Sequence, residues 1–267
     1  METHLDYWEA HALLEWQVEL GVSEAIGETP VNRYEIPKEA PKPAAAPVSS
    51  QPPTPVKAPE IDATDEAQKA VASCVSIEDI KTALLGFEHC DLRRGARNLV
   101  FQDGSLGARV MVVGDAPSRE DDIEGKPFMG PAGALFDKMF DAIGLSRTAT
   151  NPAQALYITK ALPWRPPENR DPTAREIAML KPFLLRHIEL ANPDFIVLMG
   201  NPACAATLGR TGITRLRGNW QTVLGKPALP MMSPRDILRT PLAKRDAWAD
   251  LLDLQARLRK VDTAPHS

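Results

Sequence analysis

Short apolar runs alternate with longer amphipathic segments through most of the second half of the chain. Residues 109–114 (RVMVVG) and 195–200 (FIVLMG) are apolar runs with β-branched residues, and 155–160 (ALYITK) is a weaker third. Runs of this length and composition predict buried strands. Residues 132–143 and 173–191 carry apolar side chains at helical spacing and predict helices between those strands.

Strands that alternate with helices imply a parallel sheet covered on both faces. The helix at 173–191 is preceded by a capping-box pattern, in which Glu176 follows Thr173 by three residues. A further helix is predicted over 77–85, and a hairpin over 219–231. We therefore expect an α/β fold, a three-layer α/β/α sandwich with a central, mainly parallel four-stranded sheet.

The N-terminal part of the chain differs from the rest in composition. Residues 1–28 show apolar side chains at helical spacing and predict one amphipathic helix, whereas 29–63 are rich in Pro and Ala and predict a disordered linker. The folded domain is expected over 64–260, with a disordered tail at 261–267. The N-terminal helix either binds a protein partner or packs on its own domain, and both alternatives stay open.

Charge and cysteine content narrow the classes of function. The formal net charge of -4 argues against nucleic-acid binding by the whole surface, but basic residues outnumber acidic ones by about two to one between Lys160 and Arg245. Cys74, Cys90 and Cys204 form no CxxC pair. The chain contains neither a membrane-spanning run nor a secretory signal, so we expect a cytoplasmic monomer without membrane contact.

Three loops follow the predicted strands, at the edge of the sheet where ligands bind in such folds. The first, Gly114–Gly133, is acidic and by itself is equally typical of a solvated or metal-binding loop. The second, Tyr157–Pro172, contains PWRPPENR, which suits a surface that clamps a nucleic-acid strand, although a proline-rich surface loop with incidental arginines has the same composition. The third is Leu229–Pro241 (LPMMSPRDILRTP).

The segment GDAPSREDDIEGKPFMGPAG, with its preceding strand and following helix, closely resembles the first motif of the uracil-DNA glycosylase superfamily, in its family 4 branch. The resemblance extends over residues 77–258. It implies that Asp121 is the water-orienting carboxylate and that Phe128 stacks on the base. It also implies a substrate-binding segment at the start of the motif, made of Asp115, Ala116 and Ser118. The family usually has Glu at position 115 and Gly at position 118.

The other two motifs depart from the family at the base contacts. The family's strand ends in an Asn that reads the imide edge of uracil with one donor and one acceptor, but Lys160 stands here and only donates. Ser233 replaces the His that donates to the leaving base, and a neutral hydroxyl is the weaker donor. By resemblance both line the base pocket, with Ser233 in the catalytic position. Contacts with the DNA backbone are expected from Arg165, Asn169, Arg170, Arg235 and Arg239.

The family 4 enzymes hold an iron-sulfur cluster with four cysteines. Phe87, Cys90, Trp164 and Leu180 occupy those positions, so we expect no cluster, no metal and no other cofactor.

The sequence predicts a monofunctional DNA glycosylase of base-excision repair, which hydrolyses the N-glycosidic bond of uracil or another deaminated base in single- or double-stranded DNA, with the base extruded. The alternative is a catalytically silent DNA-binding or scaffold homologue with a degenerate base pocket. A third hypothesis makes Lys160 a nucleophile that forms a Schiff base with the sugar and gives lyase activity.

Overall fold

The computed structural model describes residues 11–12, 15–16 and 63–263. It divides the chain into two units, Met1–Lys57 and Ala58–Ser267. In the first unit the four described residues are helical and exposed. The rest of the N-terminal helix, nearly all of the linker and the last four residues of the tail lie outside the described residues, so the domain limits stay predictions. Among residues 63–263 and the four before them, no helix is long and apolar enough to cross a membrane.

A six-stranded sheet lies at the centre of the second unit, in the order β1-β3-β2-β4-β6-β5. The four inner strands are parallel and include the three apolar runs: β3 (Leu156–Lys160), β2 (Val110–Gly114), β4 (Phe195–Met199) and β6 (Lys226–Met231). Two short antiparallel strands, β1 (Gln102–Gly104) and β5 (Gln221–Val223), form the edges. The parallel four-stranded centre is confirmed, and the whole sheet is two strands wider than expected.

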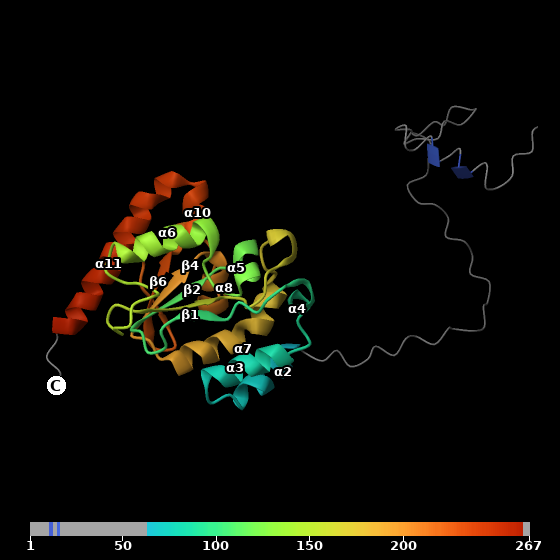
Figure 1. The fold of residues 1–267 in the computed structure, drawn as a ribbon, viewed down its shortest axis with the longest axis horizontal. Helices are drawn as coiled ribbons and strands as arrows, with labels where there is room; N and C mark the ends of the chain where they lie inside the picture. Colours follow the sequence, from blue (N-terminus) through green and yellow to red (C-terminus); the bar gives the residue numbers. More distant parts are fainter. Residues whose placement is uncertain (1–10, 13–14, 17–62, 264–267) are drawn as a thin grey trace, which may run out of the picture. The chain divides into compact units, whose positions relative to one another are not determined.

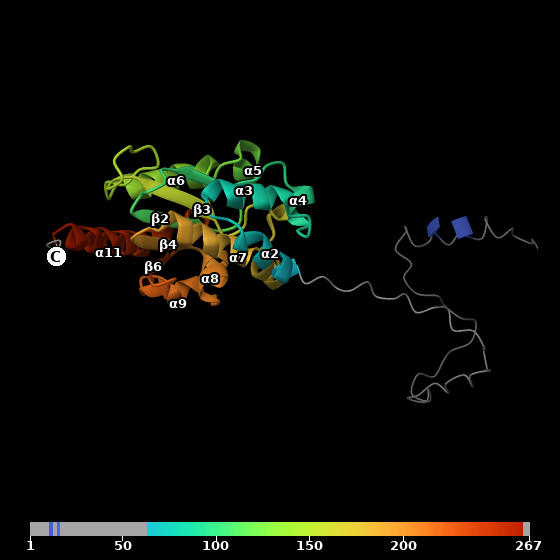
Figure 2. The ribbon, with the colours of Figure 1, turned by 90° about the horizontal axis from the view of Figure 1, so that it is seen from below.

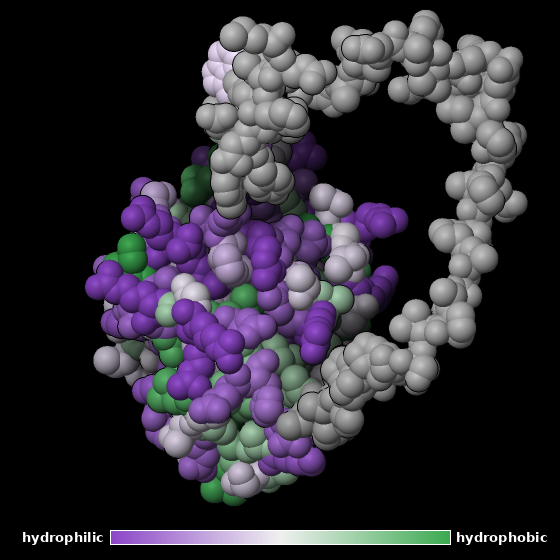
Figure 3. All heavy atoms as spheres, turned by 90° about the vertical axis from the view of Figure 1, so that its right-hand side faces the viewer, coloured by the Kyte–Doolittle hydropathy of each residue, from purple (hydrophilic) through white to green (hydrophobic). Residues whose placement is uncertain are grey.

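Helices cover both faces of the sheet, as Figures 1 and 2 show. One face carries α6 (Gly130–Asp141), α10 (Pro234–Arg239) and α11 (Lys244–Thr263), and the other carries α2 (Ala63–Ala72), α3 (Ile77–Gly86), α7 (Ala174–Ala191) and α8 (Asn201–Leu208). Shorter helical turns are α4 (Leu92–Gly95), α5 (Arg119–Glu124), η1 (Pro167–Asn169), α9 (Ile213–Leu216) and η2 (Pro241–Ala243). The face of the molecule that Figure 3 turns to the viewer is mainly hydrophilic.

Alternate residues of each inner strand enter different halves of the core. Val110 and Val112 of β2 pack in the apolar cluster that contains Phe136 of α6, whereas Met111 and Val113 pack in the cluster that contains α3 and α7. This period of two is what a strand buried on both faces requires. The three-layer α/β/α architecture is therefore confirmed.

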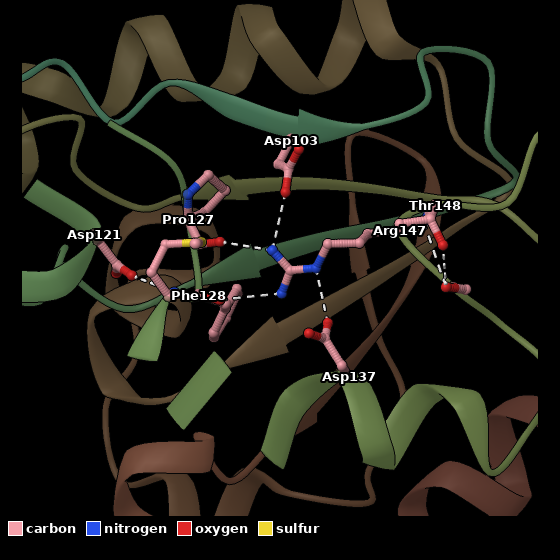
Figure 4. Close-up of polar contacts among 9 residues, drawn as sticks. Asp103, Asp121, Pro127, Phe128, Asp137, Arg147 and Thr148 are labelled. Atoms are coloured by element: carbon pink, nitrogen blue, oxygen red, sulfur yellow. Dashed lines mark hydrogen bonds and ion pairs between the residues drawn. The ribbon is translucent and has the colours of Figure 1, made fainter. Parts of the chain in front are cut away.

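Arg147 ties the loop before α6 to the sheet edge (Figure 4). Its guanidinium donates to Asp137 Oδ1 at 2.7 Å, to Asp103 Oδ2 at 2.9 Å, and to the backbone oxygens of Pro127 and Phe128 at 3.0 and 3.1 Å. Phe128 has φ 54°, in the left-handed region that non-glycine residues rarely adopt. Arg147 thus stabilises a strained turn by hydrogen bonds to its carbonyl groups.

His187 is a buried polar residue of α7, on the face of the sheet opposite to α6. It is 3% exposed, its ring stacks on Phe101 with centroids 4.7 Å apart, and it shares a hydrogen bond of 2.7 Å with the Tyr157 hydroxyl. Desolvation lowers its pKa to about 4. Between about pH 4 and 6.5 the unfolded chain therefore binds more protons at this residue, so its contribution to stability falls as the pH drops through that range.

We expect Arg147→Ala to lower the free energy of unfolding by about 2–3 kcal/mol, because two backbone oxygens and two carboxylates lose their donor. Hydrogen exchange at the Met129 amide should also accelerate, since the turn at Phe128 is released. Arg94→Ala is the matched control, because the Arg94 side chain is 80% exposed. Urea denaturation and exchange measurements check both effects; unchanged exchange in Arg147→Ala would be evidence against this role.

We expect His187→Gln to change the pH dependence of stability. We compare the free energy of unfolding of the variant with that of wild type at each pH. The difference, variant minus wild type, should be about 2 kcal/mol more positive at about pH 5 than at about pH 7, because the variant has no imidazole to protonate. Contributions of the other titrating groups cancel in the comparison. Urea denaturation at the two pH values measures it, and an equal difference at both would refute a neutral, buried His187.

Candidate active site

The neighbouring parallel strands β2 and β4 lead into helices on opposite faces of the sheet, and the candidate site lies at the carboxyl ends of these two strands. After β2 the chain continues into α5 and α6, and after β4 into α8 on the opposite face, which is the arrangement at which ligands bind in open α/β sheets. Asp115 follows β2 and Gly200 follows β4. A Cβ on Gly200 would lie 1.9 Å from Asp115 Oδ1, and Gly200 has φ +91°, so only glycine fits beside this carboxylate.

A small cavity at this edge collects the predicted chemistry. All of the residues expected to act on the base or the water line it: Asp115, Ala116, Ser118, Asp121, Phe128, Lys160 and Ser233. Its volume is about 30 Å³, which leaves room for about two water molecules. The sequence-predicted residues therefore converge, but the cavity in this conformation is too small for a nucleobase.

Lys160 fills the space between the other groups. Its Nζ atom lies 2.9 Å from Asp121 Oδ2 and 3.9 Å from the centroid of the Phe128 ring. The side chains of Lys160 and Asp121 are 6% and 1% exposed, so this is a buried ion pair. The sequence predicts Lys160 in the base pocket but carries no signal of its pairing with Asp121.

The Asp121 carboxylate has two further donors. Oδ1 accepts the Met129 N–H at 2.7 Å, and Oδ2 accepts the Ser118 N–H at 3.1 Å. Ser118 Oγ in turn accepts the Asp121 N–H at 3.2 Å, which completes a capping box at the start of α5. Ser118 and Asp121 thus fix the local backbone as well as lining the cavity.

The Phe128 ring is held between two groups. Phe136 stacks on it with centroids 4.3 Å apart and an interplanar angle of 14°, and the Lys160 ammonium lies over the ring as well. The Phe136 ring and the Lys160 ammonium cannot both fit on one face of the Phe128 ring at these distances, so they cover opposite faces. A base therefore has no free face of Phe128 to stack on until Lys160 moves.

Asp115 is buried, with 6% exposure, and its two oxygens differ. Oδ2 lies 3.5 Å from Arg235 Nη2, whereas Oδ1 has no hydrogen-bond partner among the described residues. Burial raises the pKa of Asp115 to about 6, against the opposing effect of the Arg235 and Lys160 charges. This carboxyl group therefore changes charge close to neutral pH.

Ser233 caps α10. Its Oγ accepts the Asp236 N–H at 3.3 Å and donates to Asp236 Oδ2 at 2.9 Å. The hydroxyl proton is therefore already bound to a carboxylate in this conformation. Donation from Ser233 to a leaving base requires that bond to break.

A larger cavity of about 380 Å³ adjoins the small one and shares Asp115 and Arg235 with it. Asn169 and Arg239, both predicted to contact DNA, also line it. The other two arginines predicted to contact DNA, Arg165 and Arg170, already bind side chains close to them in sequence. Arg165 donates to Asn169 Oδ1 at 2.7 Å, and Arg170 binds the Glu176 carboxylate through two nitrogens at 2.6 and 2.9 Å, at the start of α7.

Two residues that organise the site were missed from the sequence. Arg147 fixes the turn at Phe128, and Asp122 accepts the N–H groups of Arg97 and Asn98 at 2.8 and 3.0 Å. Arg147 and Asp122 both bind backbone groups that are distant in the sequence. Contacts of this kind leave no pattern among neighbouring residues from which they could be predicted. A capping box was detectable for Ser118 and Asp121, because their spacing matches that of Thr173 and Glu176 in α7.

The positions that correspond to cluster ligands do not fit an iron-sulfur cluster. Phe87, Cys90, Trp164 and Leu180 are at most 5% exposed and belong to one apolar cluster of the core. One thiol among four positions cannot ligate such a cluster. Among the residues that the structure describes, no group of three or more His, Cys, Asp or Glu side chains is placed to hold a metal ion.

Three type-4 uracil-DNA glycosylases are similar to this chain in sequence. The type-4 uracil-DNA glycosylase of Archaeoglobus fulgidus is 36% identical over 148 residues, which cover 54% of this chain and 71% of that protein. The type-4 enzyme of Thermotoga maritima is 37% identical over 153 residues (56% and 77%). The type-4 enzyme of Sulfurisphaera tokodaii is 35% identical over 149 residues (54% and 65%).

The model of the uracil DNA glycosylase superfamily matches residues 101–252. This segment contains all six strands and every residue that lines the two cavities. The match covers more than half of the chain, and the matched part is the part that forms the site. The chain therefore belongs to the uracil DNA glycosylase superfamily.

Proposed function

We propose that this chain excises uracil or another deaminated base from DNA by hydrolysing the N-glycosidic bond. The observation that carries the proposal is the convergence of all seven predicted base- and water-contacting residues on one cavity, at the edge where α/β folds bind ligands. The type-4 relatives named as uracil-DNA glycosylases support the same reaction. DNA is the proposed partner.

In this proposal the flipped base stacks on Phe128, and Arg235 and Arg239 contact the flanking phosphates. The family resemblance gives Asp121 the water-orienting role. Both steps require Lys160 to leave its present position, because its ammonium covers the ring and occupies one oxygen of the carboxylate. Lys160 therefore acts as a gate to the base pocket. Ser233 donates to the departing base once its bond to Asp236 opens.

A second candidate function is that of a catalytically silent DNA-binding homologue. The cavity of about 30 Å³ favours it, because Lys160 closes the place where a base would stack. A protein partner for the N-terminal helix and a monomeric state belong to either alternative and stay predictions.

Incubation with single- and double-stranded oligonucleotides that carry uracil or hypoxanthine, followed by cleavage of abasic sites, tests the proposed reaction. We expect the wild-type protein, in excess over DNA, to release at least one of these bases. If every substrate stays intact at the highest enzyme concentration, the silent alternative holds. A shifted band in a DNA-binding assay under the same conditions shows that such a negative result is not due to unfolded protein.

We expect Lys160→Asn to increase the single-turnover rate of uracil release by about tenfold to a hundredfold. The amide provides one donor and one acceptor for the imide edge of uracil, and one buried hydrogen bond is worth about 1–3 kcal/mol. Lys160→Ala opens the cavity without the amide and should give the smaller gain. Lys126→Asn is the matched control, since Lys126 is an exposed lysine of the loop that carries Asp121 and Phe128.

Thermal denaturation of each variant shows whether the fold survives the loss of the buried ammonium. A folded Lys160→Asn protein that releases uracil no faster than wild type would contradict the role of Lys160 as a gate.

A further inference from the structure

In its present position Lys160 leaves room at the site for a nucleotide that has lost its base. Its ammonium lies 3.9 Å from the centroid of the Phe128 ring, where a base would stack, and the cavity that remains there has about 30 Å³. The adjoining cavity of about 380 Å³ shares Asp115 and Arg235 with it and is in the size range of ligand pockets. This conformation therefore suits the product of base excision, in which the sugar and its phosphates remain.

Lys160 is the amine at this place. Among the residues that the structure describes, no other lysine lines either cavity. Lys160 is the last residue of β3 and pairs with Gly114 of β2. A Cβ on Gly114 would lie 3.0 Å from Lys160 Cδ and 2.5 Å from Phe128 Cζ, so the glycine leaves room for the lysine stem to pass the end of β2. The sheet thus holds the amine where the two cavities adjoin.

An amine attacks only in its neutral form, and Asp121 is placed to take the proton of Lys160. Asp121 Oδ2 lies 2.9 Å from Lys160 Nζ, and both side chains are almost fully buried. Transfer of the proton leaves two neutral groups where two desolvated charges were, which lowers the cost of the neutral amine in a buried site. Desolvation of this kind is one way in which proteins activate a nucleophilic lysine.

We propose that Lys160 is the nucleophile of a second activity, an abasic-site lyase that cleaves the DNA strand after the base has been released. The inference rests on the proposed function for the position of the sugar. Lys160 leaves the Phe128 ring while the base is bound and returns to it when the base has gone. Its Nζ atom then lies beside C1′ of the abasic sugar, which is an aldehyde in its open-chain form. The sequence predicts a monofunctional glycosylase, and the lyase step adds to that prediction.

The lyase reaction needs no oxidant or reductant. Asp121 takes a proton from the ammonium, and the lone pair of the amine forms a bond to C1′. The aldehyde oxygen leaves as water with one proton from the nitrogen and one from Asp121, which gives a protonated imine. Asp121 then removes a proton from C2′. The C2′–H electron pair forms the C2′=C3′ bond, and the C3′–O bond breaks, its pair leaving with the 3′ phosphate. Water hydrolyses the imine and restores Lys160.

The test uses the full chain and an oligonucleotide with a natural abasic site that was prepared without this protein. Borohydride reduces an imine to a stable amine, so we expect a covalent adduct of protein and DNA. Peptide mapping by mass spectrometry should place the DNA remnant on Lys160. Without borohydride, a denaturing gel should show strand cleavage on the 3′ side of the abasic site. An oligonucleotide with tetrahydrofuran at that position, which has no aldehyde, should give neither product.

Lys160→Asn separates this role from a merely structural one. The variant should lose both the adduct and the strand cleavage and, because the gate is open, should release uracil faster than wild type. A variant that only damages the fold would lower all three. Lys126→Asn is again the matched control, because Lys126 is exposed, and this variant should keep the adduct on Lys160 and the strand cleavage.

Peptide mapping of the wild-type protein needs no variant. An adduct only on other amines, no adduct at all, or an adduct on Lys160 without strand cleavage would overturn the inference. If uracil is released and Lys160 is not trapped, the inference fails and the proposed function stands. If Lys160 is trapped and the abasic strand is cleaved, but no base is released from any substrate, the proposed function fails by itself.

Discussion

A buried ion pair between Lys160 and Asp121 determines the state of this site. The ammonium joins the end of β3 to the start of α5 and lies on the Phe128 ring. Removal of either partner leaves the other charge in a place with almost no solvent, which is strongly destabilising for buried pairs. A substitution of Lys160 or of Asp121 alone is therefore expected to destabilise the fold. The same contact that stabilises this edge of the fold also fills the space that a base would enter, so stability and access to the pocket oppose each other here.

The position of the site follows from the topology of the sheet. β2 and β4 are neighbours whose following helices lie on opposite faces, so the chain leaves a gap between their carboxyl ends. Gly200 brings the backbone after β4 against the Asp115 carboxyl, and burial there raises the pKa of that group. Arg147 adds the third constraint, because its hydrogen bonds fix the turn that carries Phe128. Three distant parts of the sequence thus position two carboxylates and one aromatic ring.

Much of this arrangement is predictable from local sequence. Apolar runs such as Val110–Gly114 identify the inner strands, and the spacing of Thr173 and Glu176 identifies the start of α7, because both patterns report neighbouring residues. The convergence of the predicted site residues is also predictable from the sequence, since the loops that carry them follow parallel strands whose carboxyl ends share one edge of the sheet. β1 was missed because three residues (QDG) carry too little apolar signal. The Lys160–Asp121 pair was missed because the sequence does not show which charges meet across the fold.

The central claim is that Lys160 occupies the place of the base and must leave it for the reaction. A crystal structure of the protein with an oligonucleotide that carries 2′-fluoro-2′-deoxyuridine, which resists hydrolysis, tests this claim directly. We predict that uracil stacks on the Phe128 ring and that Lys160 Nζ moves away both from that ring and from Asp121 Oδ2. A bound duplex with its uracil unflipped, and with the 2.9 Å Lys160–Asp121 contact intact, would contradict it.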